Sequence, residues 1–119
     1  MLSLLLTLAL LAPPEAPVEW LSPLTVTVED TFVDEPATYT FAFRNTTDAP
    51  LVISNVRVGC GCTATEWQEA PVAPGETGRI TVTYDAAVTG YYRKSAKVFF
   101  DGHRGGHKLL IEGFVEERP

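Results

Sequence analysis

The stretch Tyr39-Thr40-Phe41-Ala42-Phe43 decides the fold class, because large aromatic side chains alternate in it with small or polar ones. Successive side chains of a β-strand point to opposite faces, so this period of two predicts a strand with one buried face. The segment Asn45 to Pro50 follows, and Asn45 is expected to form a turn through its own side chain. A strand that ends at a tight turn is therefore the first element that we expect.

The same pattern recurs on both sides of this stretch. Alternating or nearly continuous apolar and β-branched residues predict further strands at 24–28, 51–58, 80–84, 96–100 and 109–115, with a short one at 63–67. Turn residues fall between these segments, with Pro74-Gly75 typical of a type II turn and the glycines of 101–106 typical of a hairpin. No segment shows a sustained apolar repeat at helical spacing. The sequence predicts an all-β chain, an immunoglobulin-like β-sandwich of about seven strands.

The first residues differ in kind from the rest. Leu2 to Ala12 form an uncharged apolar run that is too short to span a bilayer comfortably, and a proline-rich segment follows it. This arrangement is typical of an export signal, although no Lys or Arg precedes the run. We expect a signal segment over residues 1–16, a linker over 17–23 and the sandwich over 24–119. The protein is then periplasmic or extracellular, with no membrane contact beyond the signal segment.

Length and charge restrict the classes of function. The 119 residues fit one domain, and the 45% of hydrophobic residues are enough for a core. The net charge of -6 and the pI near 4.8 oppose binding to the phosphate backbone of a nucleic acid or to an anionic membrane surface. We therefore expect no nucleic-acid partner.

Five pieces of sequence carry a resemblance to a known family. They are FAFRNT at 41–46, DAPLVI at 48–53, VRVGCGCT at 56–63, PGETG at 74–78 and LLIEGFV at 109–115. In these pieces the chain resembles the bacterial domain-of-unknown-function 1573 family, which is related to the hydin-type immunoglobulin-like domains of ciliary and centrosomal proteins. It departs from the family pattern in two loops, at Asp85-Ala86 and Asp101-Gly102. The resemblance implies an immunoglobulin-like domain of an exported bacterial protein, with no settled activity.

The two cysteines, Cys60 and Cys62, are separated only by Gly61. A cysteine pair in an exported protein favours a disulfide, but in an extended strand their Cα atoms would lie about 7 Å apart, so a bond requires a bend at Gly61 and is expected to be easily reduced. Two thiolates could instead bind Cu(I) or share Zn²⁺. A bridge or free thiols without a function is a further interpretation. Redox catalysis is the weakest interpretation, because no helix start is present.

His103 and His107 are the candidate ligands that could complete a four-ligand zinc site. In a sandwich of this order, however, the end of the third strand and the last hairpin turn lie at opposite ends of the domain. We therefore expect the two histidines to lie far from the cysteines, as exposed polar residues of a glycine-rich hairpin.

The sequence contains no catalytic constellation, since it has no nucleophile elbow, no glycine-rich phosphate loop and no evident pair of carboxylates. We expect a non-enzymatic module without a cofactor, which binds an unknown protein partner of the cell envelope through an exposed strand edge or a loop. The alternative is a copper-binding or zinc-binding protein that uses Cys60 and Cys62, and the third hypothesis is an enzyme of thiol–disulfide exchange. Four large aromatic residues could form an exposed patch for a partner, but in a domain of this size they are expected mainly in the core or at its edge; they are Trp20, Trp67, Tyr91 and Tyr92.

Overall fold

The structure is a computed structural model that describes residues 16–119. All regular elements in this part of the chain are β-strands. They are β1 (Val18–Trp20), β2 (Thr25–Thr27), β3 (Thr31–Phe32), β4 (Ala37–Asn45), β5 (Ile53–Val58), β6 (Thr63–Trp67), β7 (Thr77–Tyr84), β8 (Gly90–Phe100) and β9 (Gly106–Glu116). The all-β prediction is confirmed, and the seven predicted strands correspond to β2 and β4 to β9.

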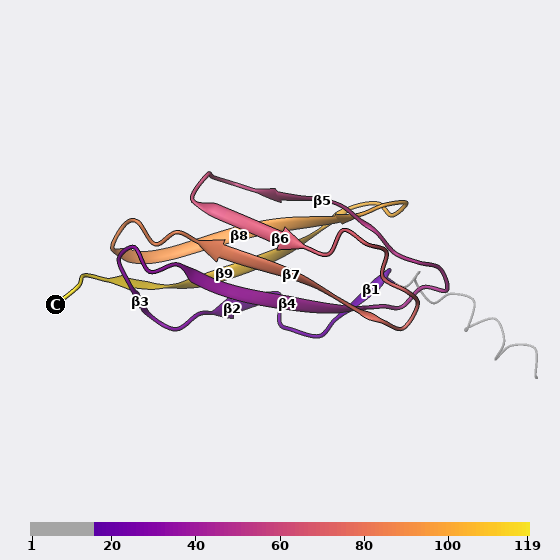
Figure 1. The fold of residues 1–119 in the computed structure, drawn as a ribbon, viewed down its shortest axis with the longest axis horizontal. Helices are drawn as coiled ribbons and strands as arrows, with labels where there is room; N and C mark the ends of the chain where they lie inside the picture. The colour runs from indigo at the N-terminus through magenta and orange to yellow at the C-terminus, as the bar shows by residue number, and fades with distance from the viewer. Residues whose placement is uncertain (1–15) are drawn as a thin grey trace, which may run out of the picture.

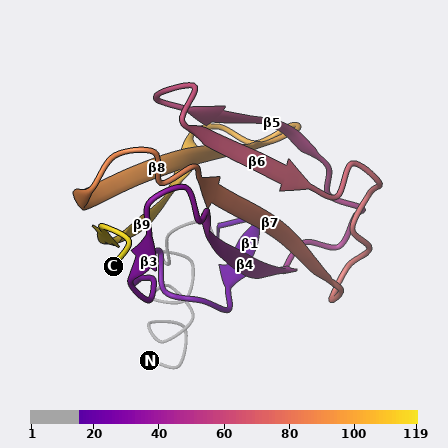
Figure 2. The same ribbon diagram turned by 60° about the vertical axis from the view of Figure 1, so that its left-hand side comes forward.

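The strands form two sheets that pack face to face (Figures 1 and 2). One sheet has the order β1-β4-β7-β6, and the other has the order β2-β9-β8-β5, with β3 also paired to β9. The long central pairs are antiparallel, whereas β2 and β3 both run parallel to β9. The chain is therefore the predicted β-sandwich.

The core lies between the sheets and follows the alternation seen in the sequence. Phe41 and Phe43 of β4 are 0% exposed, while Thr38 and Thr40 point outward and bond across to threonine hydroxyls of β7. The ring of Phe43 meets Phe100 of β8 edge to face, with ring centroids 5.2 Å apart. The period of two along β4 thus separates the buried face from the solvent face.

The strand β1 lies in the segment that we expected to be a linker, residues 17–23. Val18 is buried, and Glu19 lies opposite Arg44 of β4, with which it forms an ion pair. The sandwich therefore begins at β1 rather than at Leu24. The alternation over Val18, Glu19 and Trp20 ends at Leu21 and follows a proline-rich segment, so the place of β1 depends on pairing with β4. The predicted signal segment lies outside the described residues except for Ala16, and among the described residues no helix is long and apolar enough to span a membrane.

Asn45 is the last residue of β4 and forms a turn through its own side chain, as the sequence predicted. Its side chain is 1% exposed; Nδ2 donates to the carbonyl oxygens of Ala49 and Val72, and Oδ1 accepts from the backbone N–H and the hydroxyl of Thr47. A buried amide with all of these partners fixes the turn between β4 and β5. Its role is structural.

Candidate functional sites: the disulfide turn and the β6 edge

Cys60 and Cys62 lie in the turn that joins β5 to β6 and are linked by a disulfide bond. Their Cα atoms are 5.3 Å apart, within the usual range for a bridge, whereas the sequence pattern placed them in an extended strand about 7 Å apart. The physical reason is that β5 and β6 belong to different sheets, so the chain has to bend here. Gly61, with no other atom within 4 Å of an added Cβ, lies at that bend.

The two sulphur atoms have different surroundings. Cys60 is exposed, whereas Cys62 is half-buried against the core. The buried hydroxyl of Thr63 lies 3.8 Å from both sulphur atoms. Cys60 and Thr63 line a groove with Arg93 and Lys94 of β8, so two cationic side chains border the bridge.

The bond adds little to the stability of the fold. Disulfides stabilise mainly by restricting the unfolded chain, and the effect grows with the length of the closed loop. The bridged cysteines have a sequence separation of 2, so the closed loop contains only Cys60, Gly61 and Cys62, which corresponds to about 1.6 kcal/mol. Stabilisation of the sandwich is therefore a weak explanation for the bridge.

The structure keeps the histidines away from the cysteines, as the topology argument predicted. In the pairing of β5 with β8, Val58 lies opposite Ala96 and Ile53 opposite Phe100, so the disulfide turn and the hairpin with His103 are at opposite ends of β5. Among residues 16–119 no three Cys, His, Asp or Glu side chains come together as a metal site. On reduction, the described residues offer Cys60 and Cys62 as a pair without further ligands of these types.

His107 differs from the expectation that it is an exposed hairpin residue, whereas His103 is exposed as expected. The imidazole of His107 is half-buried, its Nδ1 accepts a hydrogen bond of 3.1 Å from Nε1 of Trp20, and its ring packs on Trp20 and Phe100. Burial lowers the pKa of His107 from its ordinary value of 6.5, because the charged form loses its hydration. The sequence argument expected Trp20 in the core or at its edge but predicted no strand over 17–23, so it gave no reason to place Trp20 beside His107.

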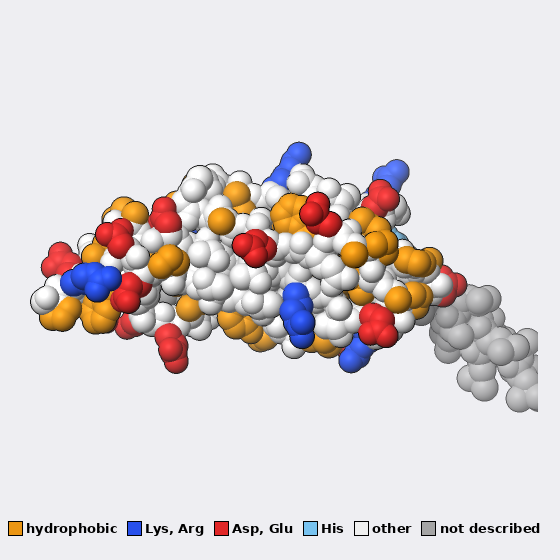
Figure 3. Space-filling model, in the orientation of Figure 1, with side chains coloured by type: hydrophobic (Ala, Val, Ile, Leu, Met, Phe, Trp, Pro, Cys, Tyr) orange, Lys and Arg blue, Asp and Glu red, His pale blue; other side chains and the backbone are white. Residues whose placement is uncertain are grey.

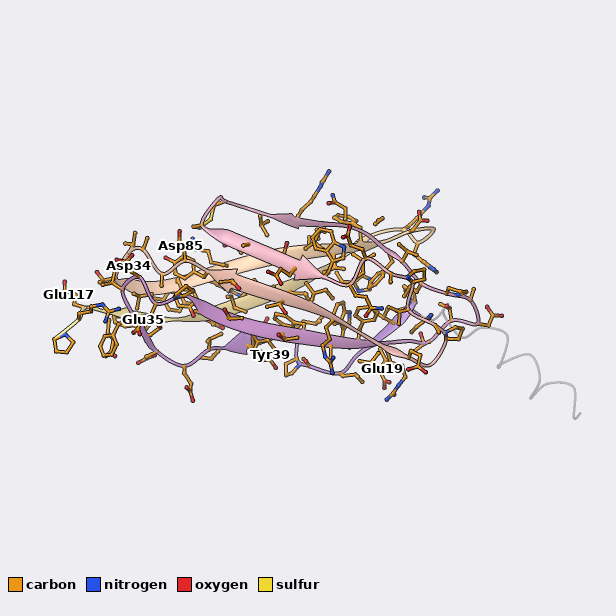
Figure 4. All side chains as sticks on the ribbon, viewed as in Figure 1. Glu19, Asp34, Glu35, Tyr39, Asp85 and Glu117 are labelled. Carbon is orange, nitrogen blue, oxygen red and sulfur yellow. A yellow bond between two sulfur atoms is a disulfide. The ribbon has the colours of Figure 1, made fainter. Side chains whose placement is uncertain are left out.

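Charged side chains do not form a basic surface on the face shown in Figure 3, where Lys and Arg are scattered among Asp and Glu. Four acidic residues, Asp34, Glu35, Asp85 and Glu117, lie around the end of the sandwich where the chain ends (Figure 4). They complete no metal-binding group within the described part of the chain. All four residues are exposed, so the acids at this end are solvated surface charges.

The large aromatic side chains divide between core and surface. Trp20 and Trp67 are half-buried and pack against the core, and Tyr92 is 4% exposed, as expected for core and core-edge residues. Tyr91 is 63% exposed and lies on β8 opposite Phe114, which is 46% exposed. This last pair adds aromatic surface on the outer face of the larger sheet, as does Phe32 of β3, which is 37% exposed.

The strand β6 presents an open backbone edge. Within residues 16–119 it pairs only with β7, and Figures 1 and 2 show β5 and β6 side by side along one side of the molecule. The Cys62 carbonyl accepts from the N–H of Asp85, so alternate residues Ala64 and Glu66 also direct their backbone groups to β7. The N–H and C=O groups of Thr65 and Trp67 therefore point away from the sheet.

A side-chain groove accompanies this edge. Trp67 and Glu66 line a groove with Thr65 and Glu69, and the same two residues line a second groove that includes Arg79. The neighbouring edge strand β5 is less regular, since its pairing shifts between Ile53 and Asn55. Bulges protect sheet edges against further pairing, so β6 is the better of the two edges for an added strand.

Comparison with known proteins agrees with the fold. The family described as "Protein of unknown function (DUF1573)" matches residues 22–115. A comparison with curated proteins gives no match.

Three solved structures show how far the likeness extends. A PapD-like domain of human CEP192 is 13% identical with a TM-score of 0.68, and the match covers 91% of each chain. A protein of unknown function from Porphyromonas gingivalis is 12% identical with a TM-score of 0.64, over 82% of this chain and 46% of that one. The Vibrio cholerae VesB protease is 11% identical with a TM-score of 0.62, over 84% of this chain and 32% of the protease. The chain thus spans less than half of the last two proteins, and at this identity the likeness shows the immunoglobulin-like fold alone.

Proposed function

The chain belongs to the DUF1573 family, whose function is unknown, and from this premise we propose that it is an exported, non-enzymatic module that binds a protein segment by strand addition. The β6 edge carries the proposal. Strand addition requires unpaired N–H and C=O groups in a row and a pocket for alternate side chains of the added strand. Thr65 and Trp67 provide the unpaired backbone groups, and the grooves beside Trp67 provide the pockets for side chains of the added strand.

The remaining features are consistent with this function. The immunoglobulin-like fold, which is similar to a PapD-like domain of human CEP192, supports a binding role rather than catalysis. The disulfide at Cys60 and Cys62 and the apolar run at the N-terminus support export to an oxidising compartment. The partner is expected to contribute an extended segment with an apolar side chain that contacts Trp67.

Photocrosslinking in the native host tests this proposal. A photoreactive residue at Glu66, on the solvent face of β6, is expected to give an adduct of one defined mass, and the same residue at Thr38, which is also exposed, is the matched control on β4. The second variant, Thr65→Pro, removes a free N–H but keeps the pairing of β6 with β7, so it is expected to abolish the adduct. Equal adducts from both positions, or an adduct that survives Thr65→Pro, would contradict strand addition at β6.

A soft-metal site at Cys60 and Cys62 is the second candidate function. The observation that favours it is the bend at Gly61, because two sulphur atoms held together become, after reduction, two thiolates that face one ion. Two thiolates suit Cu(I) better than Zn²⁺, which wants four ligands in a structural site. Titration of the reduced protein with Cu(I) against a competing chelator tests this candidate. One bound ion per chain, lost in the double Cys→Ser variant, would support it, and binding that the variant retains would exclude it.

A further inference from the structure

The difference in exposure between the two sulphur atoms indicates chemistry that is independent of the β6 edge. We propose that the Cys60–Cys62 bridge is a site of stoichiometric thiol–disulfide exchange with an external dithiol. Cys60 is exposed in the turn, so a thiolate can approach its sulphur atom from solvent. Cys62 is half-buried against the core, so its sulphur atom is the one that stays sheltered.

The surroundings of the bridge favour thiolate chemistry at Cys60. Exchange is faster when the leaving sulphur is stabilised as a thiolate, and cations and hydrogen-bond donors provide that stabilisation. The Thr63 hydroxyl lies within reach of both sulphur atoms, and Arg93 and Lys94 line the same groove as Cys60. The backbone N–H of Asp85 donates to the carbonyl of Cys62, while the carboxylate of Asp85 accepts from the N–H of Ala87 within its own turn.

Lys94 is held in position for this role. Successive side chains of β8 point to opposite faces, and Lys94 lies on the same face as Ala96 and Val98, which point into the core. The pairing of β5 with β8 ends at Ala96, so β5 does not extend to Lys94. The Nζ atom of Lys94 lies 5.2 Å from the ring centroid of Tyr84. Tyr84 in turn lies opposite Thr63 in the pairing of β6 with β7. The ammonium group is thus directed to the region between the sheets that the disulfide turn borders.

The exchange takes place in two successive attacks of thiolate on a disulfide. One thiolate of the dithiol attacks Sγ of Cys60 and forms a mixed disulfide, while the bond between the two cysteines breaks and its electron pair goes to Sγ of Cys62. The second thiolate of the dithiol then attacks the dithiol sulphur in the mixed disulfide and releases the thiolate of Cys60. Two electrons pass to the protein, the dithiol becomes a disulfide, and its two protons are available to the released thiolates.

The rate of reduction by dithiothreitol tests the proposal. The purified oxidised protein is mixed with dithiothreitol, quenched with a maleimide and weighed as an intact protein. We expect reduction in the folded state. We expect Lys94→Gln to slow it about threefold to tenfold, because the groove beside Cys60 loses a cation that favours both the attacking thiolate and the thiolate that Cys60 releases in the second step. Lys97→Gln is the matched control on the same strand, since Lys97 lies over Phe99 outside this groove, and it is expected to leave the rate unchanged.

Two single variants identify the sulphur that is attacked. The remaining thiol of Cys62→Ser, which is Cys60, is expected to react with an aromatic disulfide reagent at least about tenfold faster than the remaining thiol of Cys60→Ser, because reactivity follows access. Urea unfolding of each variant shows whether it is folded. Reduction that needs urea, a Lys94→Gln rate equal to that of the parent protein, or faster reaction at Cys62 would overturn the proposal.

Discussion

Replacement of Gly78 by Ala tests the packing between the two sheets, because a single methyl group there meets a buried ring. A Cβ at Gly78 would lie 2.3 Å from Cζ and 2.7 Å from Cε1 of Phe43. Ordinary contact begins at 3.4 Å, so the ring or the strand has to move by more than an ångström. Phe43 is 0% exposed and is held by Trp20 and Phe100, with ring centroids at 5.7 Å and 5.2 Å, so it has little room to move.

Overpacking of this kind costs about 1–3 kcal/mol, so Gly78→Ala is expected to lower the free energy of unfolding by that amount. The melting temperature is then expected to fall by about 5 to 20 °C. Urea unfolding followed by tryptophan fluorescence measures the first quantity. The matched control is Gly59→Ala, where an added Cβ has no atom within 4 Å and the change is expected to stay within about 0.5 kcal/mol. Equal stabilities of the two variants would refute the packing argument.

Three further predictions concern stability. Asn45→Ala removes the four hydrogen bonds of a buried side chain and is expected to cost about 2–4 kcal/mol in urea unfolding, and a loss below 1 kcal/mol would contradict its structural role. Burial lowers the pKa of His107 in the folded state, so the unfolded chain binds more protons than the folded one near this pKa. The free energy of unfolding is therefore expected to fall as the pH drops through about 6.5. His107→Gln is expected to remove this part of the pH dependence, and an unchanged profile would exclude His107 as its source. The double Ser variant of Cys60 and Cys62 is expected to lose no more than about 2 kcal/mol, because the bridge closes a very short loop, and a variant that cannot fold would contradict this account.

The strands that the sequence predicted are those whose pattern is set by burial against a whole sheet. Residues 39–43 alternate because β4 has one face in the core and one in solvent, and this cause acts locally along the chain. The strands β1 and β3 have three and two residues, and neither is flanked by an alternating apolar run such as that of 24–28, which indicated β2. Their positions depend on backbone bonds to β4 and β9, which are distant in sequence.

The candidate sites show the same limit. The spacing of Cys60 and Cys62 indicated the pair, and the general order of a sandwich placed the histidines away from it. The bend at Gly61 depends on the chain crossing from one sheet to the other, and the burial of His107 depends on Trp20, which is 87 residues away in sequence. Contacts of this range leave no periodic signal, so local patterns could not reveal them.

Amide hydrogen exchange along β6 tests the central claim most directly. In the free protein we predict slow exchange for Ala64 and Glu66, which bond to β7, and fast exchange for Thr65 and Trp67, whose N–H groups point outward. Addition of the partner recovered by crosslinking at β6 is predicted to protect Thr65 and Trp67 and to leave Thr38 of β4 unchanged. Protection of Thr38, or no new protection in β6, would contradict binding by strand addition.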